Sequence, residues 1–251
     1  TNKAIILNQY TQYKQMPSTK QLKKEKEKNT TVKTPWQVWH GALGNKSWKL
    51  PKCVAKTDKV NRSDQQNMTN ASEYMDYDDV LDAKMKIIAG FVKKAKCCVA
   101  YTGAGISRAA GIGDYGTKAE NSVMNSVKKL IHSAHAKPSY SHHVLANLEE
   151  QDLLHYYVQQ NHDGLPQKAG FPQWKMNEIH GAWFDPSNPV VQFSGSLRGD
   201  LFSAMTQIEE KIDLCLCLGT SLSGMNADRC VTTPCEKFAG GVDGCMGSVI
   251  A

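Results

Sequence analysis

The residues that suggest chemistry most directly form a glycine-rich turn after a short apolar run. Residues 98–101 are apolar and lead into GAGIS, residues 103–107. Glycine lets a backbone approach an anion closely, and the amides at the start of a helix point toward bound negative charge. The spacing favours a phosphate-binding turn, although Gly-x-Gly alone also serves turns that bind nothing.

Polar or glycine-containing clusters follow three further apolar runs. They are Gln160, Asn161 and Asp163 after residues 153–158, His180 and Gly181 after residues 176–179, and Gly219, Thr220 and Ser221 after residues 212–218. A histidine that titrates near neutrality can accept a proton from a hydroxyl group. Taken alone, a histidine such as His180 is more often an ordinary surface or capping residue, so its place in the ordered set carries the argument.

The elements that must position these clusters alternate along the chain. Strands are predicted over residues 98–101, 153–158, 176–179 and 212–218, with a further one over 190–193, and helices over residues 81–95, 121–133, 138–150 and 200–211. The first helix rests on a stripe of Leu81, Met85, Ile88, Val92 and Ala95. This alternation predicts an α/β fold with a doubly wound parallel sheet, whose ligands bind at the carboxyl ends of the strands.

The ordered set GAGIS, QNxD, HG and GTSL resembles the sirtuin family of NAD-dependent protein deacylases, over residues 90 to about 225. The resemblance implies a Rossmann-like, sirtuin-type fold, NAD as cofactor and acyl-lysine proteins as substrates, with the acyl group transferred to ADP-ribose. It implies catalysis by His180 as the general base together with Asn161 and Asp163. It places NAD against Gly103, Ala104, Gly105, Ser107, Ile112, Asp114, Gln160, Gly219, Thr220 and Ser221.

Cysteine usage departs from the family pattern. Sirtuins follow the His-Gly pair with two Cys-x-x-Cys pairs that bind zinc, whereas this chain has no cysteine between Cys98 and Cys215. Because four thiolates cannot be assembled there, we expect no structural zinc and a reduced small domain over about residues 181–197.

Several loops depart as well. Gly113, Tyr115, Gly116 and Thr117 stand where the family has proline, an aromatic residue, arginine and glycine, Gln159 and His162 replace threonine and isoleucine, and Phe193, Ser194 and Gly195 replace Phe-Gly-Glu. The last stretch, GSVIA (247–251), is where the family enters a strand and an asparagine-containing loop. Either the sequence stops short of that loop or the pocket lacks that wall.

The first 80 residues differ from the rest in charge. They carry 14 Lys and Arg against 8 Asp and Glu, while residues 81–251 carry 16 of each. We expect residues 1–80 to be a basic arm, extended or bound to a protein partner or assembly through Trp36, Trp39 and Trp48. The alternatives are a solvated tail or packing against residues 81–251, the NAD-binding domain. Nucleic-acid binding is disfavoured because Glu25 and Glu27 interrupt the lysines.

Composition bounds the remaining possibilities. The sequence contains no apolar run near the ~20 residues of a membrane span, and its eight cysteines include no Cys-x-x-Cys pair. We therefore expect an intracellular protein, cytoplasmic or nuclear. The functions open to it are an active deacylase, an inactive sirtuin fold serving as a structural component of a larger assembly, or an NAD hydrolase or ADP-ribosyltransferase.

Overall fold

The structure is a computed structural model that describes residues 39–60, 71–114, 117–122, 132, 134–192, 195–222 and 225–251. Its elements are β1 (Lys52–Ala55), β2 (Glu73–Met75), α3 (Asp78–Val92), β3 (Cys98–Thr102), η2 (Ala104–Ala110), α4 (Tyr140–Glu150), β4 (Tyr156–Gln159), α5 (Leu165–Lys168), η4 (Gln173–Lys175), β5 (Met176–Glu178), α6 (Gly199–Glu209), β6 (Leu214–Leu218), η5 (Asn226–Asp228), α7 (Arg229–Ala239) and β7 (Gly247–Ile250). Most of the helix expected over 121–133, and Trp36 with the rest of residues 1–38, lie outside the described residues.

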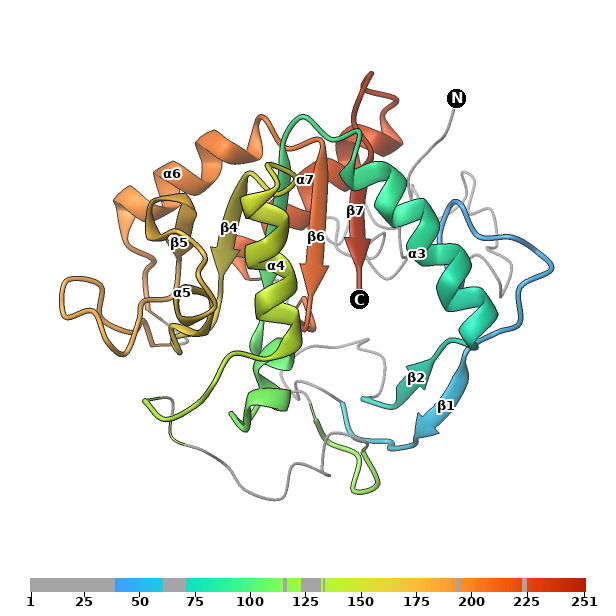
Figure 1. The fold of residues 1–251 in the computed structure, drawn as a ribbon, viewed down its shortest axis with the longest axis horizontal. Helices are drawn as coiled ribbons and strands as arrows, with labels where there is room; N and C mark the ends of the chain where they lie inside the picture. The colour runs from blue at the N-terminus through green and yellow to red at the C-terminus, as the bar shows by residue number, and fades with distance from the viewer. Residues whose placement is uncertain are drawn as a thin grey trace, which may run out of the picture.

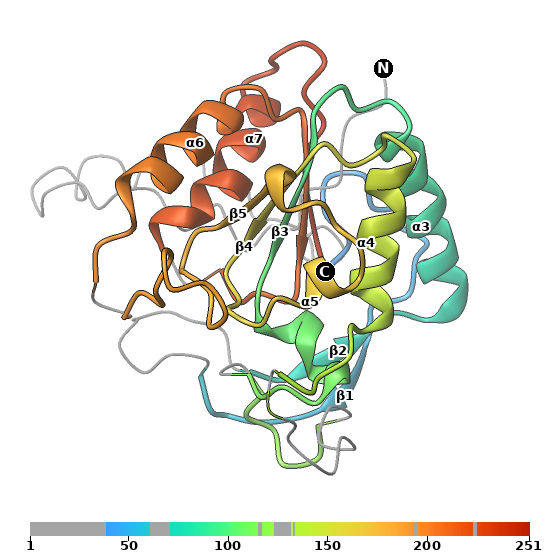
Figure 2. The same ribbon diagram turned by 60° about the vertical axis from the view of Figure 1, so that its left-hand side comes forward.

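A five-stranded parallel sheet forms the centre of the molecule, in the order β5-β4-β3-β6-β7 (Figure 1). Helices α3 and α4 cover one face and α6 and α7 the other, as Figure 2 shows. The predicted α/β fold, Rossmann-like with a doubly wound parallel sheet, is confirmed.

The two faces follow from alternation along the central strand β3. Cys98 and Ala100 pack with α3 and α4, whereas Val99 and Tyr101 pack with α6 and α7. All four side chains are completely buried. Because successive side chains in a strand point to opposite faces, an unbroken apolar run is what a strand covered on both sides requires.

Two sequence expectations about elements are wrong. The first is the start of the apolar stripe, since Leu81 and Met85 are 44% and 50% exposed. Its other members, Ile88, Val92 and Ala95, pack with the sheet core as predicted. Residues 190–192 form no strand, since the chain there belongs to an irregular loop.

The C-terminal part holds elements that the motifs did not reveal. Helix α7 packs on β6 and β7 through Cys230 and Val231. Residues 247–250 pair in parallel with β6 as β7, the strand that the family resemblance places here.

The described part of residues 1–80 packs within itself and on the domain. Strands β1 and β2 pair antiparallel, and the ring of Trp39 lies 4.4 Å from that of Tyr74, centroid to centroid. Trp48 contacts the buried ring of His40 edge-on at 5.6 Å. Leu43 packs against the sheet core. The partner expected for this segment stays a prediction.

Within the described ranges, no helix is both long and apolar enough to cross a bilayer.

Replacing Leu214 with alanine tests the sheet core. Leu214 is completely buried in β6, so Leu214→Ala should lower the free energy of unfolding by about 2–5 kcal/mol, as measured by urea denaturation. The matched change Leu81→Ala, on the exposed side of α3, should alter it by less than about 0.5 kcal/mol. Equal losses in both variants would contradict this assignment of the core.

Candidate functional site

The candidate site lies where the parallel strands end. The carboxyl ends of β3, β4, β5 and β6 meet at one edge of the sheet (Figure 1). The sequence clusters GAGIS, QNHD and GTS follow β3, β4 and β6 directly, and HG follows β5 after one residue. The topology therefore brings together the four clusters that the sequence treats as a set.

The glycine turn packs directly against the loop after β6. A Cβ atom on Gly105 would lie 2.8 Å from Gly219 Cα, and one on Gly103 would lie 2.7 Å from Thr220 Cβ. Gly219 itself has a φ of +63°, which favours glycine. Glycine is therefore required at these positions because the turn after β3 and the loop after β6 are in close contact.

The amides of the same turn depart from the sequence expectation. The Gly103 amide donates to the Leu218 carbonyl at 3.0 Å, and the Gly105 amide donates to the Gly219 carbonyl at 2.8 Å. We expected the amides of this turn to be directed at an anion, but these two are used in joining the loops.

Buried hydrogen bonds link the glycine turn to the loop after β4. The Ser107 hydroxyl donates to Asp163 Oδ2 at 2.7 Å. The Asn161 side-chain amide donates to the Gly103 carbonyl at 3.0 Å and to Ser107 Oγ at 3.1 Å. Asp163 Oδ1 accepts the Leu165 amide at 3.0 Å. Since Ser107, Asn161 and Asp163 are all buried, the bonds hold these side chains in one arrangement.

Gln160 connects the same loop to the residues after β6. Its side-chain amide donates to Thr220 Oγ1 at 3.1 Å. Thr220 Oγ1 also accepts the Leu222 amide at 3.3 Å. Ser221, beside it, is exposed.

His180 follows β5 and is only 8% exposed. Its pKa is lowered to about 4, chiefly by burial and also by nearby His162, while a hydrogen bond to the Gln160 backbone acts in the opposite direction. Within the described ranges, Nε2 of His180 is buried without a hydrogen-bond partner. At neutral pH the imidazole is therefore uncharged, with one nitrogen available as a base.

His162, which takes no part in the sequence-based site, fastens the loop that carries His180. Its Nδ1 lies 2.9 Å from the Gly181 carbonyl oxygen, and its own carbonyl accepts the Trp183 amide at 3.0 Å. A carbonyl oxygen only accepts, so Nδ1 carries the proton. The ring also lies beside the ring of Trp183, with centroids 5.7 Å apart.

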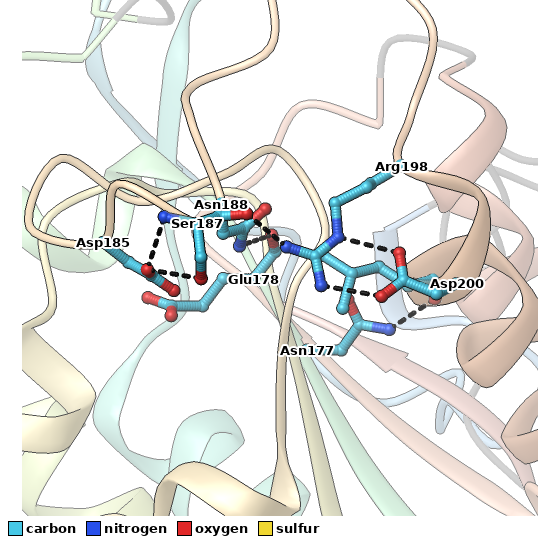
Figure 3. A network of polar contacts seen from close by, with 8 residues as sticks. Asn177, Glu178, Asp185, Ser187, Asn188, Arg198 and Asp200 are labelled. Atoms are coloured by element: carbon cyan, nitrogen blue, oxygen red, sulfur yellow. Dashed lines mark hydrogen bonds and ion pairs between the residues drawn. The ribbon is translucent and has the colours of Figure 1, made fainter.

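The loop between β5 and α6 is closed by polar contacts, shown in Figure 3. Asn188 donates to the Glu178 carbonyl at 3.1 Å. Arg198 donates to the Ser187 carbonyl at 2.8 Å and pairs with Asp200 at 2.7 Å. Helix or strand is absent from the described residues of this loop, 181–192 and 195–198. Phe193 and Ser194 lie outside the described residues.

Glu178 is a buried carboxyl group that sequence reasoning missed. It is 3% exposed, burial raises its pKa, and Gln173 Nε2 donates to Oε2 at 3.2 Å. A single acidic residue at the end of a short strand gives no signal of burial.

Ile112 and Asp114 stabilise the loop after the glycine turn. Ile112 packs with Ala110, Ala136 and Leu165. Asp114 accepts the Thr117 amide at 3.1 Å and its hydroxyl at 2.8 Å. Tyr115 and Gly116, which separate Asp114 from Thr117 in the sequence, lie outside the described residues.

Across the described ranges, no group of three or more His, Cys, Asp and Glu side chains could hold a metal ion. The zinc expectation stays a prediction.

Sequence comparison relates the chain to known proteins. A profile described as the Sir2 family matches residues 117–188. The chain is 38% identical over 114 residues to the NAD-dependent protein deacetylase sirtuin-7 of Bos taurus, covering 43% of this chain and 28% of that protein. It is 35% identical over 118 residues to the NAD-dependent protein deacetylase SRT1 of Arabidopsis thaliana, covering 45% and 25%. The chain thus spans less than a third of either relative.

Comparison with solved structures finds proteins whose titles contain the name Sir2. A structure titled "Sir2-p53 peptide-NAD+" has a TM-score of 0.49 and 23% sequence identity, covering 59% of this chain and 81% of the other. "Structure of Sir2Tm bound to a propionylated peptide" also has a TM-score of 0.49 and 23% identity, covering 60% and 81%.

Two glycine-to-alanine changes test the contact between the loops. Gly105→Ala should lower the free energy of unfolding by about 1–3 kcal/mol because its Cβ meets backbone. Gly90→Ala, in α3 with nothing within 4 Å, should raise it by about 0.5–1 kcal/mol. Urea denaturation measures both changes, and an unchanged stability of Gly105→Ala would contradict the close packing.

The pH dependence of stability tests the neutral state of His180. Burial lowers the pKa of both His180 and His142 to about 4, below the ordinary 6.5. Between these pH values the unfolded chain binds more protons than the folded chain, so the unfolding free energy should rise with pH. His180→Gln should reduce that slope by about 1.4 kcal/mol per pH unit. Val144→Gln, on the exposed side of α4, provides the control, since it replaces no titratable group and should leave the slope unchanged.

Proposed function

Because the chain belongs to the Sir2 family, the sirtuins, we propose that it removes acyl groups from protein lysines in an NAD-dependent reaction that transfers them to ADP-ribose. The observation that carries the proposal is His180, a buried neutral imidazole whose Nε2 is unpartnered within the described ranges. This base lies at the sheet edge that also carries Asn161 and Asp163.

His180 is the proposed general base. A hydroxyl group placed at Nε2 can give up its proton there, because burial keeps the imidazole uncharged above about pH 4. The Gln160 backbone accepts a hydrogen bond from the ring and would stabilise the imidazolium once it forms. The tie from His162 to Gly181 holds the backbone next to this base.

The remaining candidate residues are proposed to hold the cofactor, and NAD, when bound, would supply the ADP-ribose that accepts the acyl group. We assign the pyrophosphate to the turn Gly103–Ser107, including Ala104, the nicotinamide end to residues 160–163 with Ile112 and Asp114, and the adenosine half to residues 219–221. The support is that three of these loops bond to one another at one sheet edge. Nε2 of His180, which has no hydrogen-bond partner among the described residues, could accept a hydrogen bond from a hydroxyl group of the bound cofactor.

A structural role is the second candidate, and one observation favours it. The Ser107 hydroxyl, the Asn161 amide and the amides of Gly103 and Gly105 already have protein partners. A site whose donors are satisfied internally needs no ligand to be stable. In that case the fold would act as a component of an assembly, through residues 1–80.

Nicotinamide release from NAD in the presence of an acetyl-lysine peptide tests the enzyme proposal. His180→Ala should lower the rate by roughly 10²–10⁴-fold, the usual contribution of a positioned base. His143→Ala, which alters an exposed histidine outside the site, should leave the rate unchanged.

NAD binding, measured by calorimetry, separates the other outcomes. Binding without peptide-dependent turnover, but with peptide-independent nicotinamide release, would favour an NAD hydrolase or ADP-ribosyltransferase. Absence of both binding and release would reject the enzyme proposal in favour of the structural role.

A further inference from the structure

A cavity of about 340 Å³ lies between the loop after β1 and residues 118–121. It is lined by Lys56, Thr57, Lys59, Lys118, Glu120 and Asn121. None of these residues belongs to the candidate catalytic site. Three lysines and a single carboxylate give the cavity a net positive lining.

The first wall is held in shape by hydrogen bonds to the residues before β2. The Thr57 amide donates to Ser72 Oγ at 3.0 Å, and the Ser72 hydroxyl is 3.0 Å from the Thr57 carbonyl. The Ala71 amide donates to the Lys59 carbonyl at 2.8 Å. The backbone that carries Lys56 and Lys59 is therefore fixed by the fold.

The second wall is anchored by buried small residues. Ala119 and Ser122 are 2% and 5% exposed, and the Ser122 amide donates to the Ala119 carbonyl at 3.2 Å. The preceding Thr117 is bonded through its amide and hydroxyl to Asp114. Lys118 thus projects from a short turn that is fixed on both sides.

Among the described residues, one ion pair involves the lysines of the lining. Lys59 Nζ lies 3.9 Å from Glu120 Oε1, but the side chains are 64% and 94% exposed, so the pair contributes little and is easily displaced. Neither Lys56 nor Lys118 forms an ion pair with any residue that the structure describes. An anion entering the cavity would place negative charge beside these lysines.

We propose that this cavity binds a small molecule that carries a diphosphate group. Ammonium groups act as point-charge phosphate ligands, and the Asn121 amide and Thr57 hydroxyl add polar groups. The volume lies within the roughly 300–1,000 Å³ of small-molecule sites. A nucleic-acid strand would instead require basic residues spread along a groove. Since Asp114 holds Thr117, the site shares a loop with the proposed nicotinamide end.

Titration with inorganic pyrophosphate, followed by NMR of the backbone amides, tests this proposal. Resonances of Thr57 and Asn121 should shift, and the double variant Lys56→Gln with Lys118→Gln should weaken binding at least about tenfold. The control is Lys94→Gln with Lys211→Gln, which removes the same charge from exposed lysines outside the cavity and should leave binding unchanged.

Three results would overturn the proposal. Equal weakening in both double variants would mean nonspecific attraction to the net charge. Shifts confined to residues 103–107 would place pyrophosphate in the glycine turn. A single-stranded oligonucleotide that binds more tightly than pyrophosphate, with the same lysine dependence, would identify a nucleic-acid surface. The titration measures pyrophosphate binding and requires no catalytic turnover, so its result does not depend on whether the protein is an active deacylase.

Discussion

The site depends on one backbone-to-backbone contact, between the turn after β3 and the loop after β6. Gly105 and Gly219 approach so closely that a Cβ on Gly105 would lie 2.8 Å from the other residue's Cα. The amides of Gly103 and Gly105 hold the contact by bonding to carbonyls across it. No residue other than glycine allows this approach without displacing a strand end.

The buried polar residues follow from that contact. With the turn held against β6, Ser107 reaches Asp163 and Asn161 reaches the Gly103 carbonyl. Each polar group lost from this network would leave a buried partner unsatisfied, which costs about 1–3 kcal/mol. Stability and the proposed chemistry therefore require the same residues. Among the described residues, Nε2 of His180 is one of several buried side-chain atoms that have no hydrogen-bond partner.

The fold was predictable where local pattern and packing agree. The apolar runs of β3 and β6 are buried on both faces, so periodicity and length identified them. The stripe of α3 misled because Leu81 and Met85 lie beyond the part of the helix that packs on the sheet. Helix α7 contains Pro234 and buries Cys230 and Cys235, a pattern that no short-range rule assigns to a helix.

The sequence by itself determined the order in which strands and polar clusters follow one another along the chain. Because parallel strands place their carboxyl ends together, it also determined at which edge of the sheet the candidate residues meet. Only the tertiary structure decided what these residues do locally. Whether a glycine faces a ligand or another loop, and whether a histidine is neutral, depends on neighbours distant in the chain. Gly219 lies 114 positions after Gly105, and His180 owes its lowered pKa to burial by the assembled fold.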